Sequence, residues 1–110
     1  MKTQQVVLTT SVIAATDLIR RRFVAFDGTV CAAGAKALGV VEADTEAGGV
    51  APANILGAIL VEAGGAIAAG AEVESDASGR AVTKAAGTSN GYAWDSAAAA
   101  GDLIRIVRSI

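Results

Sequence analysis

The fold of this chain is decided by three glycine phrases: CAAGA at residues 31–35, AAGAEV at 68–73 and AAGDLI at 99–104. Alanine is the best helix former, yet across residues 28–101 no glycine-free stretch is longer than nine residues. A helix there would be interrupted about every second turn. Glycines at this density are typical of turns between short strands, so each phrase predicts a turn at its glycine.

We therefore predict an all-β chain: a small β-barrel or β-sandwich of short antiparallel strands with glycine-rich turns and an extended N-terminal arm. Its 110 residues are the usual size of one domain. We divide them into an arm or edge strand, residues 1–12, and a single β-barrel or β-sandwich domain, residues 13–110. Alanine accounts for 26 of the apolar residues, and each adds only about one methyl group to a core. A core this thin predicts that partners complete the fold.

Alternating apolar and polar residues mark the strands. Residues 17–26 read as a strand that ends at an Asp-Gly turn pair, and residues 72–75 and 80–85 read as a hairpin. The run 103–110 predicts a closing strand with its isoleucines on one face. Residues 45–54 contain the only proline and are expected to form a loop.

Segment 96–100 leaves two alternatives open. Asp95 or Ser96 could cap a single helical turn through the four alanines before the next glycine ends it. Five residues are too few for a stable helix without other support, so a tight loop fits the same residues equally well.

The apolar run from Ile55 to Val61 predicts a strand buried on both faces, either inside a sandwich or at a subunit contact. The Asn90-Gly91 pair predicts a tight turn. It leads into two aromatic residues that share one strand face and are expected in the core or an interface. The residues assigned to subunit packing are Ile55, Leu56, Ile59, Val61, Tyr92 and Trp94.

The composition excludes most catalytic and metal-binding sites. The chain has no histidine and one cysteine, so the commonest general base is missing and no disulfide or cysteine-based metal cluster can form within one chain. Cys31 is expected to be a buried, inert thiol. No spacing of Ser, Asp or Lys selects a catalytic pair, so we predict no enzyme, no metal and no cofactor. A net charge of −2 argues against nucleic acid.

Neither a membrane nor a phosphate is an expected partner. The apolar stretch 50–71 is long enough to cross a bilayer, but Pro52, Asn54 and Glu62 interrupt it. The glycine pairs lack the Lys-Ser/Thr of a phosphate loop. The one basic cluster is Arg20-Arg21-Arg22, which fits either a solvated strand end or docking against acidic residues of a partner protein.

Five phrases carry a family resemblance: FDGTV at 26–30, ALGVV at 37–41, GAIAAGAEVESD at 65–76, GRAV at 79–82 and AGDLIRI at 100–106. In this layout the chain resembles the small capsid cement, or head decoration, proteins of tailed bacteriophages. The resemblance covers most of the chain and is better in the later half. It rests on glycine-punctuated hairpins and a final strand, and it includes no catalytic signature.

The resemblance implies a structural virion protein, with no enzymatic activity and no cofactor, on the outer capsid surface. Its partners would be the major capsid protein, whose neighbouring subunits it clamps, and further copies of itself, as a homotrimer. It would lie in the host cytoplasm before assembly. An apolar N-terminal segment could add a strand to a neighbouring chain. The residues assigned to capsid contact are Val6, Val7, Leu8, Arg20, Arg21 and Arg22.

Two alternatives belong to other classes. A carrier domain of the biotinyl or lipoyl type is also a small glycine-rich β-sandwich, and Lys84 would then be the modified residue. The flanking residues of Lys84 lack the usual carrier pattern, and two symmetric halves are not evident. The other alternative is an oligomeric scaffold subunit unrelated to phage. Mass spectrometry separates the carrier from the rest, because only a carrier needs a covalent adduct.

Overall fold

The computed structural model describes residues 2–109 and contains strands but no helix in that range. The fold is therefore all-β, as the glycine phrases predict. The eight strands are β1 (Gln5–Ile13), β2 (Phe23–Val24), β3 (Gly39–Val41), β4 (Val50–Glu62), β5 (Val73–Ser75), β6 (Ala81–Thr83), β7 (Tyr92–Ala93) and β8 (Leu103–Arg108).

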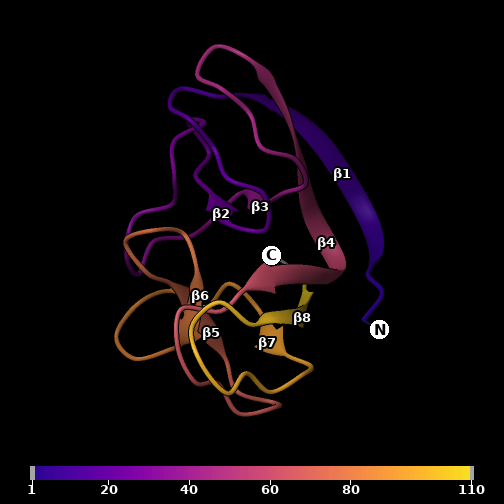
Figure 1. The fold of residues 1–110 in the computed structure, drawn as a ribbon, viewed down its shortest axis with the longest axis vertical. Coiled ribbons are helices and arrows are strands. Elements are labelled where there is room, and N and C mark those ends of the chain that lie inside the picture. The colour runs from indigo at the N-terminus through magenta and orange to yellow at the C-terminus, as the bar shows by residue number, and fades with distance from the viewer. Residues whose placement is uncertain (1, 110) are drawn as a thin grey trace.

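Strand β4 organises the sheet. The hydrogen-bonded order is β2-β3-β4-β8-β7, every pair is antiparallel, and β1 also pairs with β4. One edge of β4 meets β3 at residues 53–54 and then β8 at 57–62, while β1 runs along the opposite edge over residues 50–58. The β5–β6 hairpin forms a separate two-stranded sheet. Figure 1 shows β1 following β4 along the outside of the molecule.

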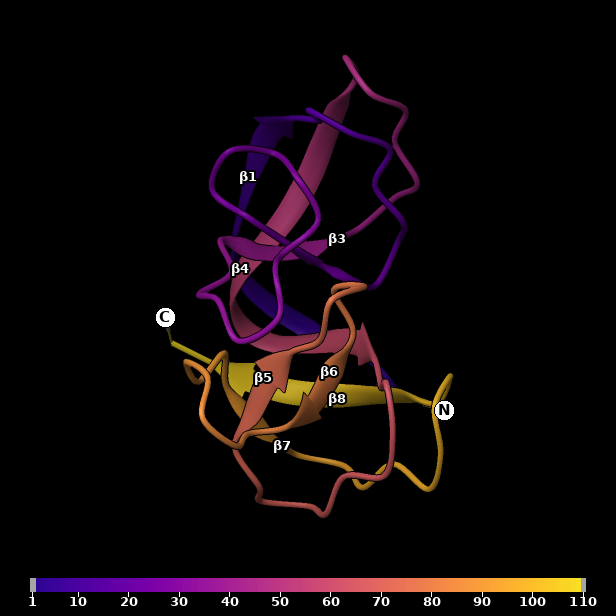
Figure 2. The same cartoon turned by 90° about the vertical axis from the view of Figure 1, so that its left-hand side faces the viewer.

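A bend in β4 divides the molecule into two parts. Gly57 has a φ of +115°, which only glycine adopts readily. The β1–β4 register shifts at the same place, because Val6 pairs with Gly57 and Leu8 with Leu56, so Val7 is the extra residue of a bulge. Figure 2 shows β1, β3 and the first half of β4 in one part and β5–β8 in the other.

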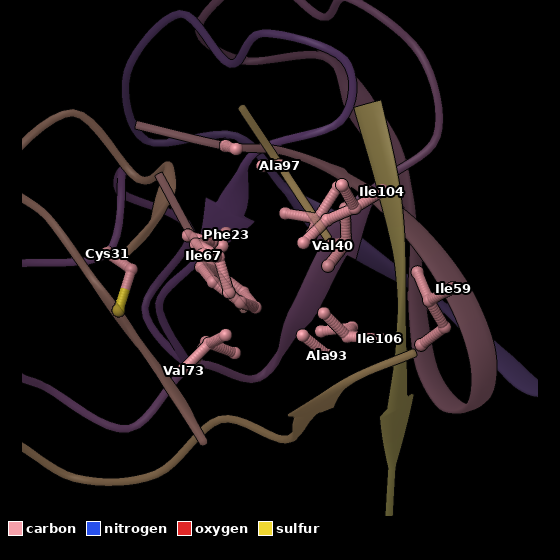
Figure 3. Close-up of a cluster of buried hydrophobic side chains, with 14 residues drawn as sticks. Phe23, Cys31, Val40, Ile59, Ile67, Val73, Ala93, Ala97, Ile104 and Ile106 are labelled. Carbon is pink, nitrogen blue, oxygen red and sulfur yellow. The ribbon is translucent and has the colours of Figure 1, made fainter. Parts of the chain in front are cut away.

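The core consists of two clusters that meet at β2 and β3. Phe23 and Val40 lie in the larger cluster, whereas Val24 and Val41 lie in the smaller one. Successive side chains of a strand point to opposite faces, so this short pair of strands is buried on both sides, with each of the four residues at most 1% exposed. Figure 3 shows the larger cluster, which includes Phe23 and Val40 as well as Ile59 of β4 and Ile104 and Ile106 of β8.

The turns predicted at the three glycine phrases and the predicted hairpin are confirmed. Gly34, Gly70 and Gly101 all have positive φ values, 72°, 86° and 95°, and each lies in a turn or next to one. The predicted hairpin of residues 72–85 is β5 paired with β6. The Asp-Gly turn after residue 26 is also present, closed by the Ala25 amide donating to the Thr29 carbonyl at 2.8 Å.

The predicted loop over residues 45–54 is wrong in its second half, because β4 already begins at Val50. Proline is tolerated at position 52 because of where its backbone points. The Pro52 carbonyl accepts from the Glu42 amide at 2.9 Å, beyond the last β3–β4 pair, Val41 with Ala53. The nitrogen of Pro52 faces the same edge as its carbonyl, where the ladder has ended and no donor is needed.

Two other predicted segments differ. The strand expected over 17–26 has only two residues in β2, because the chain before it is held by single contacts such as Leu18 with Thr45. Segment 96–100 forms the loop and not the helical turn. The Asp102 carboxylate closes that loop by accepting from the Ala98 amide at 2.9 Å. The capping side chain therefore follows the segment, whereas the predicted caps, Asp95 and Ser96, lie at its start.

Candidate functional site

The N-terminal strand β1 is the first candidate surface. Seven of its nine residues are exposed, and the exposed fractions of Val7 and Leu8 are 76% and 45%. Val6, the third residue of the predicted capsid-contact group on this strand, is half-buried. Strand β1 is therefore held to β4 mainly by its backbone, and it leaves apolar side chains in contact with water.

Polar side chains fasten the start of β1 to the body of the chain. The Gln4 side chain accepts from the Leu60 amide at 3.1 Å and donates to the Glu42 carboxylate at 2.9 Å. Glu42 also accepts from Asn54 and from Arg21. Burial alone would raise the pKa of Glu42, but hydrogen bonds from Gln4 and Asn54, together with the nearby arginine charge, hold that pKa below its ordinary value.

The three arginines of the predicted capsid contact do not form one basic surface. Arg21 donates to Glu42 at 3.1 Å with its side chain only 12% exposed, and Arg22 donates to Glu62 at 3.3 Å. Arg21 has a φ of +69°, held by its amide on the Val41 carbonyl and its carbonyl on the Glu62 amide. Arg20 alone is exposed, so the charge available to a partner at this cluster is smaller than the sequence indicates.

Most of the β4 residues assigned to subunit packing serve the chain's own core. Ile59 and Val61 are fully buried in the larger cluster, and Ile55 is 8% exposed. Leu56, beside the bend, is half-buried. Leu56 and Ala58 lie on the less buried face of the run, whereas Ile55, Ile59 and Val61 are buried within this chain. These side chains offer little surface to a second subunit because β8 and the residues of the larger cluster already cover them.

Tyr92 and Trp94 lie on the second candidate surface, the outer face of β7 and β8. They are 54% and 52% exposed, so they are not core residues. Tyr92 pairs with Val107, which is 52% exposed, and Leu103 on the same face is 44% exposed. The Arg105 guanidinium lies 3.9 Å from the centre of the Trp94 ring. Tyrosine, tryptophan and arginine are the residues that most often dominate protein interfaces.

An ion pair holds this second surface in place. The Asp95 carboxylate accepts from the Arg105 side chain twice, each time at 2.9 Å, and from the Arg105 amide at 2.9 Å. These bonds lower the pKa of Asp95 to about 2, with the Arg105 side chain as the largest cause, against the opposing effect of burial. The charge of Arg105 is therefore neutralised within the surface.

The lowered pKa of Asp95 predicts acid sensitivity. In the unfolded chain the carboxyl titrates near its ordinary value of 3.8, so the folded form gains stability above that pH and loses the gain as the pH falls towards 2. We expect Asp95→Asn to destabilise the chain by on the order of 1 kcal/mol at neutral pH, the usual size for an ion pair that water still partly reaches. Urea unfolding of the wild type and of Asp95→Asn at pH 7, 4 and 2.5 measures this difference in stability. A difference between the two chains that does not shrink towards pH 2.5 would contradict it.

Two buried polar residues have roles that the sequence interpretation missed, and one of them, Asn90, was expected in a tight turn that the structure does not contain at residues 90–91. Arg108 is 2% exposed, and its guanidinium donates to the carbonyls of Ala37, Leu38 and Ile55; burial lowers its pKa to about 10. Asn90, fully buried, accepts from the Ala37 amide at 2.9 Å and donates to the Ala35 carbonyl at 3.0 Å. The alternating pattern of the last strand places residue 108 on its buried face, and this pattern could have predicted the burial of Arg108.

The remaining features of the described residues concern metal binding, the cysteine, membrane spanning and Lys84. Within residues 2–109 no group of three or more Cys, Asp or Glu side chains is placed to hold a metal ion. Cys31 is buried, as expected, and burial raises its pKa. In the same range the structure contains no helix long and apolar enough to cross a membrane. Lys84 follows the end of β6, away from the 76–79 turn of the hairpin.

Comparison with known proteins identifies the family. The model of the phage cement protein family matches residues 1–108. The crystal structure of the head fiber gp8.5 N base in bacteriophage phi29 has a similar fold, with a TM-score of 0.78, 24% sequence identity and 93% of each chain covered. A search of curated proteins finds no match. The chain therefore belongs to the phage cement protein family and has the fold of a head fiber base.

Proposed function

We propose that this phage structural protein binds the outside of the capsid and stabilises contacts between neighbouring subunits of the major capsid protein. The observation that carries the proposal is the family match over residues 1–108. The exposed apolar side chains of β1 support it, because Val7 and Leu8 are available to a partner without disturbing either core cluster. Arg20 is the one arginine of its cluster that is exposed.

The stabilisation follows from mass action. A protein that binds only the assembled lattice adds RT ln(1 + [L]/Kd) at each site, about 2.7 kcal/mol when its free concentration is about 100 times Kd. Many such sites on one shell add up, so contacts that are individually weak raise the free energy needed to open it. This mode of action needs exposed apolar and aromatic side chains and does not need a catalysed reaction.

Self-association is part of the proposal. The face with Tyr92 and Trp94 has a cation–π pair and three apolar or aromatic neighbours in water, which suits the centre of a subunit contact. A homotrimer that uses this face remains a prediction. Residence in the host cytoplasm before assembly is a separate prediction.

Adding purified protein to expanded capsids that lack it tests the function. We expect electron microscopy to show extra density on the outer surface, between major capsid subunits. We also expect the temperature at which the capsids break open to rise with added protein until the sites are filled. Unexpanded shells serve as the control for lattice specificity. Capsids without added density would contradict binding, and density with an unchanged opening temperature would contradict stabilisation.

A further inference from the structure

We propose that a basic pocket at the end of β8 receives the Asp102 carboxylate of a neighbouring copy of this chain, and that such contacts close a head-to-tail homotrimer. The proposal rests on the self-association inferred above and names the residues that meet. The pocket and the carboxylate lie at the two ends of the outer face of β7 and β8, so this one face supplies both halves of the contact.

The pocket lies where the loop before β7 meets the last residues of β8. Its volume is about 180 Å³, the space of several water molecules at about 30 Å³ each, which suits the end of one acidic side chain. Tyr92 and Val107 form part of its lining, and both are more than half exposed on the outer face. A second copy that packs on this face therefore reaches the pocket.

The lining carries more positive than negative charge. Its cations are Lys36 and Arg108, and its one acidic residue is Glu72. Lys36 is half-buried and donates to the Ser89 carbonyl at 3.0 Å, while the Nε of Arg108 is buried and has no hydrogen-bond partner within residues 2–109. Neither cation takes part in an ion pair of the described chain. A carboxylate that enters the pocket would supply the missing partner charge.

Asp102 is the matching group at the other end of the face. It is exposed and directly precedes β8, and its Oδ2 is held by the amides of Ala98 and Ala99 at 2.9 and 3.3 Å. Within residues 2–109 it belongs to no ion pair, whereas Asp95 is already paired with an arginine of its own chain. Lys2, the cation at this end, donates to a backbone carbonyl of β8. Asp102 is therefore a positioned carboxylate that a neighbouring copy can bind.

A three-fold ring needs two different contact patches on each copy, because every copy meets one neighbour with one patch and the other neighbour with the second. Figure 2 shows β8 running across its part of the molecule, so its first and last residues lie on different sides. If the outer face of β7 and β8 turns towards the three-fold axis, the Asp102 end of each copy meets the pocket of the next. The same negative-to-positive contact then repeats around the ring and leaves no end unpaired.

Charge reversal tests the contact. K36E and D102K each place like charges opposite each other at every contact of the ring, which should weaken assembly by about tenfold or more. The double variant K36E/D102K restores opposite charges at every contact and should assemble like the wild type. Native mass spectrometry over a concentration series counts the chains. We expect three for the wild type and the double variant, and one for each single variant at concentrations where the wild type is trimeric.

Matched controls and the capsid assay separate the outcomes. K84E and E46K make the same changes of charge at a half-buried lysine and an exposed glutamate away from β7 and β8, and they should keep three chains. Cooperative thermal unfolding of each variant shows that it is folded. A trimer that K36E and D102K leave intact, or a double variant that stays monomeric, would overturn the pocket contact while leaving the homotrimer in place. A monomeric wild type that still binds capsids would overturn the contact and the self-association but not the capsid binding.

Discussion

A chain with Gly57→Val is expected to lose about 2–5 kcal/mol of its folding free energy, a large part of the usual 5–15 kcal/mol. Two penalties combine at this position. A φ of +115° is strained for any residue with a Cβ atom. In addition, a Cβ built on Gly57 would lie 2.8 Å from the Val7 amide and closer still to the Gln5 carbonyl oxygen. Both are backbone atoms of β1, so relief requires β1 to move away from β4.

Two other glycines separate these penalties. Gly70 has a φ of +86° with no atom within 4 Å of a Cβ, and Gly65 has neither a positive φ nor a close neighbour. In chemical denaturation we expect Gly70→Val to cost about 1–2 kcal/mol, from strain alone, and Gly65→Val to cost less. Hydrogen exchange should show faster exchange of β1 amides only in Gly57→Val. Equal losses in the Gly57 and Gly70 variants would contradict a role for the bend in holding β1.

The glycine positions were predictable because their cause is local. A turn that needs a positive φ selects glycine at that residue, so the phrases at Gly34, Gly70 and Gly101 indicate turns without knowledge of any partner. The β5–β6 hairpin was predictable for the same reason, since its strands and its turn lie within a few residues of each other. Gly57 was not distinguished, because its role depends on β1, some fifty residues earlier in the chain.

The candidate surfaces were less predictable because exposure depends on distant residues. Arg21 and Arg22 form a basic cluster in the sequence, but their partners are Glu42 and Glu62. An apolar run such as Ile55–Val61 has the same pattern whether the chain itself or a neighbour covers it, and here the chain does. Tyr92 and Trp94 show the reverse case, because the sequence predicts them in a core or an interface and within this chain they are 54% and 52% exposed.

Deletion of residues 2–10 is expected to abolish capsid decoration while the rest of the chain stays folded. None of these residues belongs to either core cluster, and two of their three apolar side chains, Val7 and Leu8, are already exposed. The main losses inside the chain are the backbone ladder to β4 and the side-chain bonds of Gln4 and Thr9. We therefore expect a lower melting temperature but a cooperative transition, and no density on the capsid.

A milder variant shows whether the side chains or the strand itself make the contact. Val7→Ser combined with Leu8→Ser keeps the hydrogen-bonded strand but removes much of the exposed apolar surface, so occupancy should fall well below that of the wild type. The matched control is Phe26→Ser, which alters a 60% exposed apolar residue on a turn outside β1 and should leave occupancy unchanged. Full occupancy of the deletion variant would remove β1 from the capsid contact. Full occupancy of the double serine variant alone would assign the contact to the β1 backbone, because the ladder edge is the part of the strand that this variant retains.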